Sequence, residues 1–303
     1  MAIAKRIFLF LAVNLLVVTM LTLVLSLFNV QPYLTAHGLD YRSLMIFCLV
    51  WGMGGAFISL ALSKTMAKWM MGVQIIDPAT ANAEMRSLVE TVHDLCRAAH
   101  MTHLPEVGIY ESPEPNAFAT GPSQKRSLIA VSTGLLRKMS HEELEGVLAH
   151  EITHIVNGDM VTMTLVQGIV NAFVMFLARA LAYVASGLLK NKNDSSSGSY
   201  LSYTLFVFLF QFVFMILGSI VVAWFSRLRE FRADLGGSHI AGKEKMIAAL
   251  EALQRMSQIQ DPAHAKPSFD AMKISTPKKR GWMSFFSSHP PLEIRIQRLK
   301  ESF

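Results

Sequence analysis

The sequence predicts an α+β integral membrane protein, with about four transmembrane helices and a cytosolic helical domain that carries a small antiparallel sheet. The composition, the long apolar segments and the patterns of the polar segments lead to this fold class. Of the 303 residues, 52% are hydrophobic and 17% are charged, and the mean hydropathy is +0.37. Soluble proteins carry about a quarter charged residues, so part of the chain must lie in a medium other than water. With only two cysteines, Cys48 and Cys96, the chain has no disulfide framework and no cysteine-ligated zinc site.

Four segments are long and apolar enough to cross a membrane. They are Ile7–Phe28, Leu44–Leu62, Val161–Leu189 and Leu201–Phe225. The first runs for about 22 residues without a charge, enough for a hydrocarbon core about 30 Å thick, whereas a cleaved signal peptide would have a shorter apolar region. Gln167, Asn171 and Arg179 interrupt the third segment, so we expect it either to span or to lie partly re-entrant.

Positive charge beside these segments predicts their orientation. The flanking cations are Lys5, Arg6, Lys64, Lys68, Arg227, Arg229 and Arg232. With four spans they all lie on one side, which the positive-inside rule makes the cytosol, together with both termini. The loops 31–42 and 191–200 would then face out. The predicted parts are an N-terminal transmembrane hairpin (1–63), a cytosolic part (64–160), a second transmembrane hairpin (161–225) and a second cytosolic part (226–303).

The polar segments show the patterns of a packed domain. Asp77-Pro78 opens a helical pattern with apolar residues at three- and four-residue spacing. Three short extended runs, separated by turns rich in proline and glycine, predict the small antiparallel sheet. These runs are Glu106–Glu111, Asn116–Thr120 and Ser127–Ser132. Ser140 with Glu143 forms a capping box, which predicts the start of another helix.

The helix that begins at Ser140 carries the sequence HEITH at His150–His154. The four-residue spacing puts both imidazoles on one helical face about a turn apart, as two nitrogen ligands of a tetrahedral zinc require. Glu151 lies beside them, in place to accept a proton from a water at the metal. The pattern therefore predicts a catalytic zinc site.

A catalytic zinc usually has three protein ligands, so a third should come from another segment. Glu230 is a candidate, within the sequence RLREFRAD that follows the fourth apolar segment. An acid among arginines is also typical of a salt-bridged helix face, and composition alone favours that interpretation. Asp234 shares the helical face of Glu230, where it would be placed to hold a ligand histidine in one tautomer.

Several separated motifs occur in a family's order along nearly the whole chain. They are PNAFATG at Pro115–Gly121, LAHEITHIVNGD at Leu148–Asp159, REFRAD at Arg229–Asp234 and SSHPPLEIRI at Ser287–Ile296. With the two pairs of apolar segments around them, these motifs resemble the HtpX family of membrane-embedded zinc endopeptidases, which are relatives of the prenyl-protein CAAX endopeptidases. The resemblance implies a zincin-like catalytic domain with one zinc per chain.

The resemblance also implies roles for particular residues. Zinc would be bound by His150, His154 and Glu230. The catalytic residues would be Glu151, as general base, and His289, as transition-state partner, and the site would be supported by Asn157, Asp234 and Arg295. The substrate backbone would lie along an edge strand formed by Asn116, Ala117, Phe118 and Ala119. Strand addition would give broad specificity, because it reads the peptide backbone.

The expected function is a zinc-dependent endopeptidase of the bacterial inner membrane that cleaves misfolded or membrane proteins on the cytosolic side. The resemblance implies protein quality control under stress, alongside an ATP-dependent membrane protease. The sequence contains no Walker-type motif, so ATP-driven unfolding is not built in. The alternatives are a non-catalytic zinc-stabilised scaffold or assembly factor, an intramembrane protease and, more weakly, a prenyl-protein protease. We interpret the basic stretch around Lys278 as a contact for anionic lipid, and we expect no nucleic acid partner.

Overall fold

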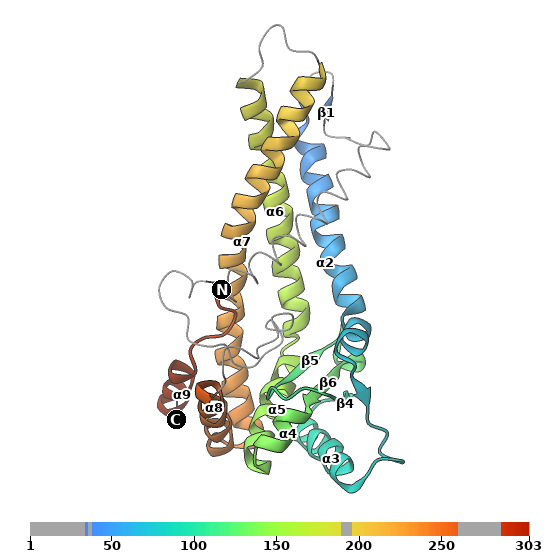
Figure 1. Cartoon of the computed structure of the whole chain (residues 1–303), viewed down its shortest axis with the longest axis vertical. Coiled ribbons are helices and arrows are strands. Elements are labelled where there is room, and N and C mark those ends of the chain that lie inside the picture. Colours follow the sequence, from blue (N-terminus) through green and yellow to red (C-terminus); the bar gives the residue numbers. More distant parts are fainter. Residues whose placement is uncertain (1–33, 36–37, 189–195, 260–285, 303) are drawn as a thin grey trace. The chain divides into compact units, whose positions relative to one another are not determined.

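The structure, a computed structural model, describes residues 34–35, 38–188, 196–259 and 286–302 (Figure 1). The predicted first span, Ile7–Phe28, and the basic stretch around Lys278 lie outside these residues. The described chain divides into two compact units. One contains the residues up to Phe57 together with Leu165–Val222, and the other contains Ile58–Thr164 together with the residues from Ala223 onward.

Three helices of the described chain are long and apolar enough to cross a membrane. They are α2 (Tyr41–Met71), α6 (Asp159–Leu188) and α7 (Ser196–Ala241). The predicted second and fourth spans lie within α2 and α7. The third predicted span lies in α6 as far as Leu188, and α6 is one continuous helix. A short antiparallel hairpin of β1 (Leu34–Thr35) and β2 (Gly38–Leu39) precedes α2.

Close helix packing in the first unit explains two unusual residues. A side chain at Gly52 of α2 would meet the backbone of Ala172 in α6, so glycine is needed for the approach of these helices. Arg179 of α6 is 2% exposed, and its guanidinium lies 5.7 Å from the ring centre of Phe47. The arginine therefore faces protein, which is where a charge within an apolar helix is tolerated.

A four-stranded sheet lies in the second unit, with the strand order β3-β4-β6-β5. The strands are β3 (Gln74–Ile75), β4 (Glu106–Tyr110), β5 (Ala117–Thr120) and β6 (Leu128–Ser132), and a short 3-10 turn, η1 (Gln124–Arg126), precedes β6. The three predicted extended runs form β4, β5 and β6, but the prediction of an antiparallel sheet is wrong for one pair. The β4 and β6 strands run parallel, because the chain reverses twice and β6 enters between β4 and β5. All five residues of β6 are buried, as expected of a central strand covered on both faces.

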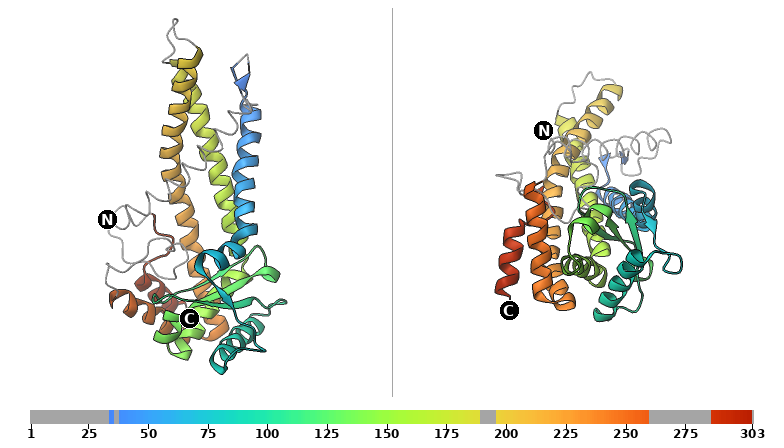
Figure 2. Two further views of the ribbon diagram at one scale, coloured as in Figure 1. Left: turned by 45° about the vertical axis from the view of Figure 1, so that its right-hand side comes forward. Right: turned by 60° about the horizontal axis from the view of Figure 1, so that its bottom comes forward.

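Five helices lie wholly within the described part of the second unit (Figure 2). They are α3 (Ala83–Ala98), α4 (Thr133–Lys138), α5 (His141–Val156), α8 (Lys243–Ile259) and α9 (Leu292–Glu301). The α3 helix begins later than its pattern suggests, because Asp77 caps a local turn and Asn82 provides the N-cap. The predicted capping box of α5 is present, with Ser140 and Glu143 bonded reciprocally.

The core of the second unit forms around α5. Leu148 and Ile152 of this helix are fully buried with Val92 of α3, Ile129 of β6 and Leu250 of α8. A side chain at Gly146 would collide with the backbone of α8, so α5 and α8 pack at close range. Because α5 is packed on several sides, its polar residues His150, Glu151 and His154 are held in place.

Candidate metal centre

The α5 helix presents two histidines on one face, as their spacing predicts. His150 is 2% exposed, and its ring lies edge-on to that of His154 with 4.7 Å between the ring centres. Both rings are held between the buried apolar residues of the helix and the end of α7. The local sequence therefore fixes the pair, and the tertiary fold buries His150 and leaves His154 partly exposed.

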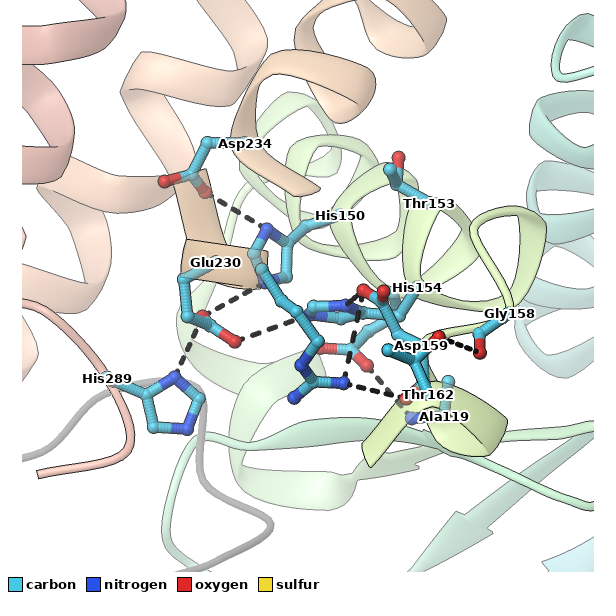
Figure 3. A network of polar contacts seen from close by, with 12 residues as sticks. Ala119, His150, Thr153, His154, Gly158, Asp159, Thr162, Glu230, Asp234 and His289 are labelled. Carbon is cyan, nitrogen blue, oxygen red and sulfur yellow. Dashed lines mark hydrogen bonds and ion pairs between the residues drawn. The ribbon is translucent and has the colours of Figure 1, made fainter. Parts of the chain in front are cut away.

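Glu230 of α7 completes a three-residue group (Figure 3). Its Oε2 lies 3.5 Å from His150 Nε2, and its Oε1 lies 3.5 Å from His154 Nε2. Each carboxylate oxygen therefore faces one imidazole nitrogen, and the three ligand atoms lie within 4.8 Å of one another, close enough to share one metal ion. Glu230 is 1% exposed, so its carboxylate is withdrawn from water and faces both imidazoles. The donors present fit a divalent metal ion.

Each histidine also faces a carboxylate through its other ring nitrogen. His150 Nδ1 lies 3.0 Å from Asp234 Oδ1, and His154 Nδ1 lies 2.6 Å from Asp159 Oδ2. Such carboxylates orient ligand histidines and strengthen their basicity. The first contact is the one the sequence predicts for Asp234, whereas Asp159 was not predicted; its signal was an acid just after the glycine that ends the histidine helix.

Two arginines from distant parts of the chain contact the two outer acidic residues. Arg295 of α9 donates to both oxygens of Asp234, at 2.8 and 2.6 Å, and its Nη1 lies 3.3 Å from Glu230 Oε2. Arg229 of α7 donates to the carbonyl oxygen of Asp159 at 3.2 Å. Arg295 is only 1% exposed, so these acids balance its charge away from water.

The charges of this network favour a cation. Its carboxylates, Glu151, Asp159, Glu230 and Asp234, outnumber its guanidinium groups, Arg229 and Arg295, by two. Burial alone lowers the pKa of both histidines, but the neighbouring carboxylates outweigh it and raise them, that of His154 to about 10. In the metal-free chain, protonated imidazoles balance these two charges, and a divalent cation bound by the neutral imidazoles would take their place.

Glu151 lies on the same helix with its carboxylate directed at the sheet. Its Oε2 accepts a hydrogen bond of 2.9 Å from the backbone N–H of Ala119, on β5. The β5 strand is at the end of the strand order, and its ladder with β6 leaves the N–H of Ala119 pointing outward. A hydrogen bond therefore links the edge strand β5 to Glu151.

Of the other predicted site residues, some reach the metal centre and others do not. His289 Nδ1 lies 2.8 Å from Glu230 Oε2, so the histidine does reach the centre. Asn157 is exposed at the end of α5, and no contact joins it to the network within the described residues. Asn116, Ala117 and Phe118 are buried, whereas Ala119 is partly exposed.

A family model for Peptidase family M48 matches residues 82–302, which include every residue of the network. The chain belongs to this family. A protein named Protease HtpX homolog from Bacillus subtilis is 50% identical over 98% of this chain and 99% of its own length. One from Methylacidiphilum infernorum is 47% identical over 98% of each chain. The fold also resembles the crystal structure of S. mikatae Ste24p, with a TM-score of 0.60 and 19% identity over 92% of this chain and 61% of that chain.

The M48 peptidase is thus a membrane-bound metalloendopeptidase that acts on polypeptides. This confirms the family, the enzyme class and the membrane association predicted from the sequence. The family implies a metal, and His150, His154 and Glu230 form the candidate site for it.

Proposed function

We propose that the M48 peptidase binds one zinc ion through His150, His154 and Glu230 and hydrolyses peptide bonds with Glu151 as general base. The observation that carries this proposal is the convergence of two imidazole nitrogens and a carboxylate beside a second, buried carboxylate. Two nitrogen donors and one oxygen donor are a common ligand set of catalytic zinc, which keeps its fourth position open.

The residues around the site divide the work of peptide hydrolysis. A bound zinc would polarise the scissile carbonyl and lower the pKa of water toward about 7. Glu151 takes the proton from the attacking water and delivers it to the leaving amine. The backbone N–H of Ala119 holds the Glu151 carboxylate in place. We assign His289 as the donor that stabilises the developing oxyanion, in keeping with its place beside Glu230.

We also propose that extended segments of substrate lie along β5. The position of β5 at the end of the sheet supports this proposal, because an edge strand offers unpaired backbone groups to a peptide. Ala119 is the residue of the predicted edge that is both partly exposed and bonded to the general base. Binding through the backbone suits misfolded polypeptides and membrane proteins as substrates, since it demands no fixed sequence.

The bacterial inner membrane, with the catalytic unit in the cytosol, is the proposed location. Lysines and arginines at the ends of α2 and α7 support this orientation: Lys64, Lys68, Arg227, Arg229 and Arg232. Protein quality control under stress is the proposed role, in keeping with the HtpX proteases that the chain is similar to. Cooperation with an ATP-dependent membrane protease stays a prediction.

Replacing Glu151 by Gln tests the mechanism. The Glu151→Gln variant keeps the zinc ligands but loses the base, so we expect about one zinc per chain and a loss of casein cleavage of at least about a hundredfold. Zinc is measured by elemental analysis of the detergent-purified protein, and cleavage is measured in the same preparation. Glu142→Gln, an exposed acid on the same helix, should leave both values unchanged.

The same experiment separates the protease from a zinc-stabilised scaffold. Full casein cleavage by Glu151→Gln would exclude Glu151 as general base. Zinc in both proteins with cleavage in neither would favour the scaffold, in which Glu151 has no chemical task.

A further inference from the structure

The two candidate ligand histidines are supported in the same way, but only one support has been assigned. His150 has Asp234 on its Nδ1, and His154 has Asp159, at 2.6 Å. A carboxylate only accepts hydrogen bonds, so Nδ1 of His154 carries a proton, and Nε2, on the side of Glu230, is the nitrogen left to bind a metal. Asp159 thereby sets the tautomer that a metal ligand needs.

The turn after α5 delivers Asp159 to this position. The helix ends at Val156, and Gly158 follows with φ +66°, a left-handed conformation that glycine adopts without strain. The next helix, α6, begins at Asp159. The Asp159 carboxylate therefore lies next to the last turn of α5, where it contacts His154. Asp159 is 6% exposed, which shields the contact with His154 from water.

Arg229 fixes Asp159 from the opposite side. Its Nη1 donates to the carbonyl oxygen of Asp159 at 3.2 Å and lies 4.0 Å from Oδ2. Arg229 precedes the candidate ligand Glu230 in the chain, so adjacent residues of α7 contact His154 and the acid that supports it. On the other histidine, Arg295 holds Asp234 more directly, through two hydrogen bonds to its carboxylate.

We propose that Asp159 is a positioning residue of the metal centre, which orients His154 and is itself held by Arg229. This inference rests on the proposed function, because it requires that His154 is a ligand. It assigns a role to the first residue of an apolar helix, so α6 and α7 each supply a group that holds the metal site. Replacing an outer carboxylate of this kind typically weakens metal binding about 10- to 100-fold.

The test measures zinc affinity, which does not depend on turnover. The full-length protein is purified in detergent, stripped of metal by a chelator and titrated with zinc against a chromophoric competitor. We expect Asp159→Asn to weaken zinc binding about 10- to 100-fold, as Asp234→Asn should also do. Asp94→Asn, an exposed acid on α3 paired with Arg97, is the matched control and should stay within about twofold of wild type.

A second variant covers the case in which Asp159→Asn does not fold. Asp159→Glu keeps the charge but lengthens the side chain, so it should also weaken zinc binding if position is what matters. Circular dichroism of the metal-free proteins establishes that each variant is folded. A folded Asp159→Asn that binds zinc like wild type, while Asp234→Asn loses affinity, would refute this inference alone. Failure of the wild-type chain to bind zinc would instead refute the proposed function and the inference with it.

Discussion

Arg295 is a charged side chain buried in the second unit, with 1% of its surface exposed. Burial disfavours its charge, but Asp234 and Glu230 outweigh that effect and keep the pKa of the guanidinium above its usual range. The arginine therefore stays charged and neutralises the acids behind the candidate metal ligands. Its sequence context, a helical segment near the C-terminus, gives no local sign of this burial.

Arg295→Met should destabilise the second unit strongly. The change leaves Asp234 as a buried carboxylate without its partner, and breaking a buried pair on one side typically costs about 3–5 kcal/mol. The free energy of unfolding is measured by denaturant titration of the metal-free protein in detergent. Arg298→Met is the control, because Arg298 is exposed on the same helix, with its guanidinium 4.4 Å from the ring centre of Phe231. This substitution should lower the free energy of unfolding by about 1 kcal/mol or less. Equal losses in the two variants would contradict the role of Arg295.

At the scale of elements, α5 is the helix that the sequence specifies most completely. Its start follows from the capping box at Ser140, its buried face from the apolar spacing, and its chemistry from the two histidines. The sheet beside it is specified less well. The extended runs were predicted, yet their parallel and antiparallel pairing depends on where β6 enters, and no local pattern records that.

Ser140→Ala should weaken α5 at its start without changing the metal site. Loss of an N-cap typically costs about 1 kcal/mol, and the cap lies about 15 Å along the helix from His150. We expect faster amide exchange in the first turn of α5 and an unchanged zinc affinity. Ser123→Ala is the matched control, since Ser123 precedes η1 without a side-chain capping bond. A large loss of zinc affinity in Ser140→Ala would contradict this prediction, because it would show that fraying of the first turn of α5 displaces His150 and His154.

On the scale of the whole molecule, the chain alternates between apolar helices and a polar catalytic unit. The α2, α6 and α7 helices each begin in one compact unit and end in the other, so the same continuous helices serve both. The residues that surround the candidate metal come from α5, α6, α7 and α9, which are separated by long stretches of sequence. The α6 and α7 helices consequently carry both an apolar segment and residues of the candidate metal centre.

A topology experiment tests the proposed orientation. A fluorescent protein fused after the C-terminus should fluoresce, because it folds in the cytosol, whereas an alkaline phosphatase inserted in the 191–200 loop should be active outside. The reciprocal fusions provide the controls. The opposite pattern would place the catalytic unit on the other side of the membrane.

The sequence by itself determined the apolar helices, the capped histidine helix and the identities of the first two candidate ligands. These features repeat with the period of a helix or depend on neighbours within a turn, so the local chain encodes them. Only the tertiary structure decided that Glu230 faces both histidines rather than the arginines beside it alone, that Asp159 supports His154, and that β4 and β6 run parallel. Those contacts join residues on different elements, and their geometry follows from how buried surfaces pack rather than from any period in the sequence.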